Sequence, residues 1–140
     1  MNVQSDKLTR LRQWLEKAEH DLVTAICVLR ISDDCPCDTI CFHAQQCVEK
    51  YFKSLLFWLE IDFPKTHDLR ALILLLPRRV SKQLDVDDIL PLNRYAIAAR
   101  YPEEWEPIAR SEAKAALAVA RQVRRLIRQH LPKSALRKRN

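Results

Sequence analysis

Residues 38–61 read DTICFHAQQCVEKYFKSLLFWLEI, and this stretch decides the fold. Apolar side chains recur every three or four residues, as on one face of an α-helix, at Cys41, Ala44, Val48, Tyr51, Leu55 and Trp58. More apolar residues widen this zone toward the end of the stretch, as in a helix that is covered on more than one side. The opposite side is polar and carries His43, Gln46, Lys50 and Lys53. The stretch therefore predicts a central helix with one polar strip.

Similar periodicity predicts four more helices around this one, over about residues 5–30, 67–76, 85–100 and 108–131. The helix at 85–100 is expected to bend at Pro91, and a linker is expected at residues 78–84. Glycine is absent, which excludes the Gly-rich loops that bind phosphate and disfavours tight β-hairpins. We therefore predict an all-α protein, an antiparallel four- to five-helix up-and-down bundle formed by residues 1–132.

The chain has no segment that predicts membrane insertion or export. Its longest apolar run, residues 71–77, is far shorter than the roughly 18 residues that cross a bilayer. Its first residues are polar and lack the apolar core of a secretory signal. The five cysteines are an odd number, and we expect them to be reduced thiols in a cytoplasmic protein.

Positive charge is concentrated at the C-terminal end. Residues 1–112 hold 15 Lys and Arg and all 18 Asp and Glu, whereas residues 113–140 hold nine Lys and Arg and no acid. A basic stripe of this kind is typical of a surface that binds a polyanion such as RNA. It is also found on solvated helix faces that bind nothing, and residues 133–140 are predicted to be a disordered basic tail.

Four short motifs follow one another along the chain: FHAQQCVEK at 42–50, PKTHDL at 64–69, NRY at 93–95 and RYP at 100–102. Together with Ala18, Asp21, Leu22 and Ala25, they resemble the HEPN family of small helical proteins over roughly residues 8–131. The resemblance implies a helical bundle that forms a homodimer. It also implies a partner of the minimal nucleotidyltransferase type, commonly in a toxin–antitoxin pair. Many members of the family are metal-independent ribonucleases.

The polar positions of these motifs are candidates for binding a nucleotide or a phosphate. They are His43, Gln46, Lys50, Lys53, Thr66, His67, Arg94, Arg100 and Tyr101. The Lys and Arg side chains would supply charged hydrogen-bond donors to the phosphate. The alternative for Gln46, Lys50 and Lys53 is modest support of the helix through pairs four residues apart, and for His43 it is a hydrogen bond on the helix surface or between helices. Thr66 or His67 could instead cap the next helix.

The resemblance also implies a nuclease signature, an Arg followed four to six residues later by a His. The predicted helix at 85–100 lacks that His. Arg125 and His130 match the spacing, but in an Arg-rich segment where a chance match is easy. His43 with Arg94 is a second candidate pair of base and cation for RNA cleavage. We therefore expect a dimeric nucleotide- or RNA-binding module, with the alternatives of a ribonuclease toxin or a dimerisation domain without a ligand.

Zinc is the one metal for which the sequence offers suitable ligand types. Cys35, Cys37, Cys41 and His43 lie close together, but their spacing differs from that of paired zinc knuckles. Cysteines on the apolar faces of helices are more simply explained as small buried thiols. We expect neither a metal nor another cofactor.

Overall fold

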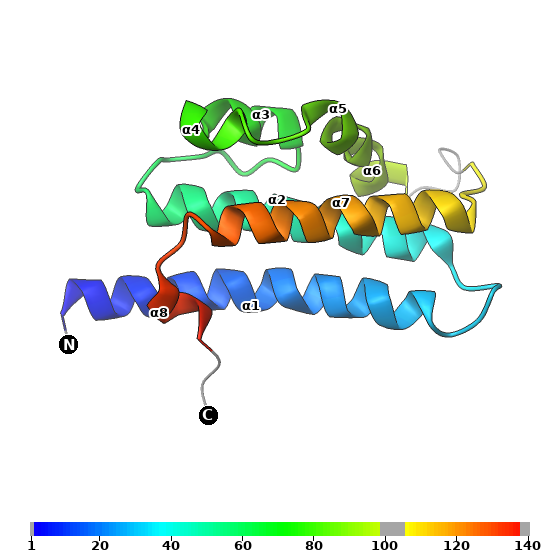
Figure 1. The fold of residues 1–140 in the computed structure, drawn as a ribbon, viewed down its shortest axis with the longest axis horizontal. Helices are drawn as coiled ribbons and strands as arrows, with labels where there is room; N and C mark the ends of the chain where they lie inside the picture. Colours follow the sequence, from blue (N-terminus) through cyan, green and yellow to red (C-terminus); the bar gives the residue numbers. More distant parts are fainter. Residues whose placement is uncertain (1, 99–105, 138–140) are drawn as a thin grey trace.

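The structure is a computed structural model that describes residues 2–98 and 106–137, and all of its regular elements in these ranges are helices (Figure 1). Three long helices form its body: α1 (Val3–Leu29), α2 (Cys37–Trp58) and α7 (Arg110–Arg128). The short helices are α3 (Leu69–Leu75), α4 (Arg78–Ser81), α5 (Val86–Ile89), η1 (Leu90–Arg94), α6 (Tyr95–Ala98) and α8 (Lys133–Leu136). No helix of the described ranges is long and apolar enough to cross a membrane.

The helices form three layers, with α1 on one side, α2 and α7 in the middle, and α3 to α6 on the other side (Figure 1). The chain runs along α1 and returns along α2. The short helices then carry it back toward the start of α2, and α7 runs in the same direction as α2. The predicted all-α bundle with its up-and-down order is therefore confirmed. The short helices α3 to α6 together take the place of its third long helix.

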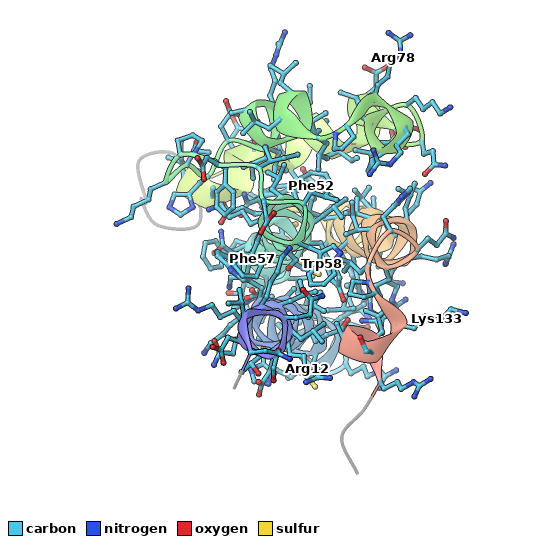
Figure 2. All side chains as sticks on the ribbon, turned by 90° about the vertical axis from the view of Figure 1, so that its left-hand side faces the viewer. Arg12, Phe52, Phe57, Trp58, Arg78 and Lys133 are labelled. Atoms are coloured by element: carbon cyan, nitrogen blue, oxygen red, sulfur yellow. The ribbon has the colours of Figure 1, made fainter. Side chains whose placement is uncertain are left out.

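α2 is central because most of its circumference is apolar. Tyr51, Phe52, Leu55 and Leu56 are fully buried. Figure 2 shows Phe52 on the side of α2 that faces the short helices and Trp58 on the side that faces α1. Burying a large apolar side chain stabilises the fold by about 1.5–3 kcal/mol. The small Ala113, Ala116 and Ala120 of α7 let it pack closely against α2.

The segment predicted as one helix over 85–100 is divided into α5, η1 and α6. Pro91 lies in the first turn of η1, where its ring and its missing N–H prevent a continuous α-helix. The predicted linker at 78–84 contains α4, which starts after Pro77. The fourth helix of the prediction is therefore a chain of short helices around Pro91.

The segment predicted as a disordered tail also contains structure. α8 packs beside α1, where Nη2 of Arg12 donates to the carbonyl oxygen of Ser134 at 2.9 Å. Ala135 is buried in the same contact. The folded part thus extends past residue 132, because Pro132 starts a new turn after α7 instead of ending the ordered chain. Residues 138–140 lie outside the described residues.

Candidate functional site

One buried carboxylate joins two of the predicted site residues. Asp21 of α1 is 7% exposed, and its Oδ1 lies 2.7 Å from Nδ1 of His43. Its Oδ2 lies 2.5 Å from Nζ of Lys50. His43 and Lys50 are seven residues apart, which is two turns of α2, so both reach the same side of the helix. Their side chains are each 25% exposed, so this group, which we call the Asp21 cluster, opens to solvent.

A second carboxylate gathers two more predicted residues. Oε1 of Glu49 lies 2.9 Å from Nδ1 of His67, and its Oε2 lies 3.2 Å from Nζ of Lys53. Gln45 donates to Glu49 at 3.4 Å and to the carbonyl oxygen of His67 at 3.2 Å. Glu49 and Lys53 are both buried, so their ion pair is shielded from water. We call this group the Glu49 cluster.

The two clusters are neighbours on the polar strip of α2. Gln46 lies between their positions on the helix and donates to Oε1 of Gln45 at 2.6 Å. Thr66 stands apart from both, because its hydroxyl accepts the N–H of Asp68 in the turn before α3. Asp68 caps α3, so His67 contributes its ring to the Glu49 cluster and does not cap that helix. The structure thus brings five of the nine predicted residues together along one strip: His43, Gln46, Lys50, Lys53 and His67.

Arg94 lies elsewhere. Its guanidinium forms an ion pair with Glu112 of α7, and Oη of Tyr95 donates to the same carboxylate at 2.7 Å. Tyr95 also contacts Cys41, which is nine residues before Lys50 and therefore on the opposite side of α2. His43 and Arg94 are thus not brought together in this structure. Arg100 and Tyr101 lie outside the described residues.

The surroundings of Arg94 form a cleft of about 600 Å³ between α6 and α7, lined by Arg94, Tyr95, Ile97, Glu106, Pro107, Ile108 and Glu112. Burial raises the pKa of Tyr95, and burial raises the pKa of Cys41 to about 11. Both groups are therefore neutral at physiological pH. The charge of the Arg94 cation is balanced by Glu112, which lies on the same cleft.

The Arg125 and His130 pair is separated as well. His130 lies beyond the end of α7, and its Nε2 is 3.0 Å from Oε1 of Gln83. Arg125 makes no hydrogen bond or ion pair within the described residues. Arg125 is exposed on α7, whereas His130 contacts Gln83 beyond the end of that helix. Within one chain, the structure does not assemble them into a site.

Cys35 and Cys41, near the start of α2, have different neighbours. Sγ of Cys35 accepts a hydrogen bond from Nη1 of Arg110 at 3.4 Å, whereas Cys41 is buried against Tyr95. Arg110 donates to the carbonyl oxygens of Leu29 and Ser32 too, and so ties the end of α1 to α7. In the described part of the chain, no three His, Cys, Asp or Glu residues form a group that could hold a metal ion.

Sequence reasoning identified the pair of Glu49 with Lys53 but missed the contacts that Asp21 makes with His43 and Lys50. Asp21 belongs to a motif of the first helix, but its contact with α2 depends on how α1 packs. The same holds for Glu19, whose Oε1 lies 2.6 Å from Nε of Arg124 and also pairs with Arg128 and Tyr51. A signal was available only for Glu49, which stands four residues before Lys53.

Comparison with known proteins agrees with this architecture. The HEPN domain model matches residues 11–130. The crystal structure of TT1696 from Thermus thermophilus is similar, with a TM-score of 0.71, 29% identity, and coverage of 87% of this chain and 98% of that one. The structure of ST0689, an archaeal HEPN homologue, has a TM-score of 0.63 at 21% identity over 86% of this chain and 96% of that one. No curated protein gives a significant match. Because the domain model covers most of the sequence, this chain belongs to the HEPN domain family.

Proposed function

We propose that this HEPN-family protein is a dimeric module that binds a nucleotide or RNA through the Asp21 cluster. One observation carries the proposal: Lys50 and His43 share a single buried carboxylate and remain partly exposed. A lysine ammonium has three N–H donors, and Asp21 takes one of them. Nε2 of His43 makes no hydrogen bond within the described residues, so Lys50 and the protonated form of His43 can each donate to an anion.

The shared carboxylate also prepares the site for a phosphate. Without Asp21, the Lys50 ammonium and the His43 ring would each sample many rotamers. Asp21 holds both in place at distances of 2.5 and 2.7 Å. Binding then costs less side-chain entropy than it would for free Lys and His residues. Phosphate oxygens are suitable acceptors because hydrogen bonds between charged partners are the stronger kind.

The exposed side of α7 favours a polynucleotide over a mononucleotide. Lys114, Arg121 and Arg125 lie on one line of the helix and make no ion pair within the described residues. They span eleven residues, or roughly 16 Å of helix, which is enough for several phosphates of a strand. Arg124 and Arg128 do not join this line, since both bind Glu19.

The partner part of the proposal rests on the family alone. We propose a nucleotidyltransferase-type partner and a homodimer, in a pair of the toxin–antitoxin type. Co-expression of this chain with the product of the neighbouring reading frame, followed by size-exclusion chromatography with light scattering, tests both points. Elution of the chain alone at a monomer mass, or without the second protein, would argue against them.

A second candidate is a metal-independent ribonuclease, and the contact between Asp21 and His43 favours it. A carboxylate that accepts a hydrogen bond from Nδ1 of a neutral histidine leaves Nε2 as the proton acceptor, which is the arrangement of a general base. Lys50 is the adjacent cation that could stabilise charge on a phosphate. In this ribonuclease mechanism Lys50 is the cation that partners His43, whereas the sequence had indicated Arg94 for that role.

Titration of the protein with AMP, and separately with inorganic phosphate, tests the anion site. Lys50→Glu should abolish binding of both probes because it reverses the charge beside Asp21. Arg94→Glu should leave the affinity unchanged, since Arg94 lies with Glu112 on the other side of α2. Equal losses in the two variants would reject the Asp21 cluster as the site.

A further inference from the structure

A second cleft lies in the layer of short helices, away from the polar strip of α2. It has a volume of about 610 Å³ and is bounded by α3, α4, α5 and η1. Its lining residues are Arg70, Ile73, Leu74, Leu76, Arg78, Ser81, Lys82, Val86 and Leu90. Figure 2 shows Arg78 at the outer side of this layer, away from α1. The site of the proposed function uses none of these residues.

The cleft combines an apolar floor with a cationic rim. Ile73 and Leu76 are nearly buried and form part of the floor, while Leu74 is 76% exposed and extends the apolar surface outward. Arg70, Ile73 and Leu74 share one side of α3 because they are three and four residues apart. Pro77 separates α3 from α4 and lets the second helix turn, so that Arg78 and Lys82 reach the same opening.

The rim cations have no counter-charge among the described residues. Arg70, Arg78 and Lys82 are exposed, and their side chains make no hydrogen bond or ion pair with any residue that the structure describes. No acidic residue in residues 2–98 or 106–137 lines the cleft, and Asp85, Asp87 and Asp88 of the neighbouring α5 segment are not part of it. Ser81 adds one hydroxyl to the lining, between Arg78 and Lys82 in the sequence.

We propose that this cleft binds a small amphipathic anion, a carboxylate attached to an apolar chain. Pockets for small ligands typically have volumes of about 300–1,000 Å³, apolar walls and a few polar groups that fix the orientation. The apolar chain would lie on Ile73, Leu74 and Leu76, and the carboxylate would accept hydrogen bonds from Arg78 and Lys82. An uncharged apolar ligand would leave these cations unused, and an inorganic anion would leave the floor exposed.

The test is calorimetric titration of the full chain with sodium dodecanoate, kept below the concentration at which it forms micelles. Saturable binding of one dodecanoate per chain is expected. The double variant Arg78→Gln/Lys82→Gln should weaken it by about tenfold or more, and Leu74→Gln should weaken it as well. These positions are exposed, so the variants should keep the wild-type circular dichroism spectrum and melting temperature.

Three controls make the result specific. Arg10→Gln/Lys17→Gln removes the same charge from exposed positions of α1 that make no ion pair within the described residues, and this variant should bind dodecanoate like the wild type. Dodecyltrimethylammonium has the same chain with a cationic head and should not bind in the cleft, and acetate should not bind measurably. Equal binding of the two amphiphiles, or equal loss in the two double variants, would overturn the proposal. Absence of saturable binding would also overturn it and leave the cleft to a larger occupant such as a protein segment.

Discussion

Oδ1 of Asp21 lies 2.7 Å from Nδ1 of His43, although the two residues belong to different helices. Oδ2 of the same carboxylate binds Lys50, so one side chain of α1 determines the positions of two side chains of α2. The contact therefore links the packing of the bundle to the proposed site. A change at Asp21 should affect both the stability of the fold and the binding of an anion.

Asp21→Asn is expected to lower the free energy of unfolding by about 1–3 kcal/mol, because His43 and Lys50 lose a charged partner at a largely buried position. Urea denaturation followed by circular dichroism measures the change. Asp33→Asn is the matched control, since Asp33 is exposed in the loop after α1. Equal midpoints for wild type and Asp21→Asn would show that the carboxylate does not hold the two helices together.

Glu49→Gln should be more destabilising, by about 3 kcal/mol, because the buried Lys53 keeps its charge and loses its counter-charge. The double variant Glu49→Leu/Lys53→Met removes both charges and should recover much of that loss. Urea denaturation of the two variants under the same conditions compares them. A double variant less stable than Glu49→Gln would contradict the assignment of this pair as a shielded ion pair.

Stability should fall as the solution becomes alkaline. Burial raises the pKa of Cys41 from 9.0 to about 11 and also raises the pKa of Cys47, Tyr51 and Tyr95. Between the unfolded and folded pKa values the folded state holds more protons, so the free energy of unfolding decreases as pH rises above about 9.

Urea denaturation at pH 8 and pH 10.5 measures this loss, to which Cys41 should contribute on the order of 1–2 kcal/mol. Cys41→Ala should lose less stability over the same interval than the wild type. A stability that stays constant between the two pH values would contradict the burial of these groups in neutral form.

The order of the long helices could be predicted from sequence because their apolar spacing is regular over many turns. The bend at Pro91 was predicted, but the division into α5, η1 and α6 was not, since the apolar spacing continues through a proline whose effect depends on neighbouring helices. At Pro132 the prediction erred in the other sense: the ordered chain was expected to end there, but Pro132 precedes a short packed helix. The spacing of apolar residues thus predicted where the helices form, whereas the positions at which they end also depend on how the helices pack.

The site was predictable only in part, for the same reason. His43, Gln46, Lys50 and Lys53 lie on one helix, so their common side follows from spacing. Asp21 and Arg94 come from other helices, and neither spacing nor residue type indicates that the first joins Lys50 while the second joins Glu112. Contacts between helices far apart in sequence require the packed structure.

The ribonuclease alternative makes its own prediction. Purified protein should cleave single-stranded RNA in the presence of EDTA, and His43→Ala should lower the rate by about 100-fold or more because the base is removed. His130→Ala should leave the rate unchanged, since His130 binds Gln83 and lies apart from the Asp21 cluster. Loss of cleavage in His130→Ala alone would instead assign the activity to the Arg125 and His130 pair.

The most direct test of the central claim is the affinity for a fluorescently labelled single-stranded RNA, measured by anisotropy at two salt concentrations. We predict saturable binding to the wild type that weakens with salt, and at least about fivefold weaker binding to Lys50→Gln. Arg79→Gln, an exposed position on α4 outside both clefts, should bind like the wild type. Wild-type protein that does not bind RNA, or equal affinities for wild type and Lys50→Gln, would contradict the account.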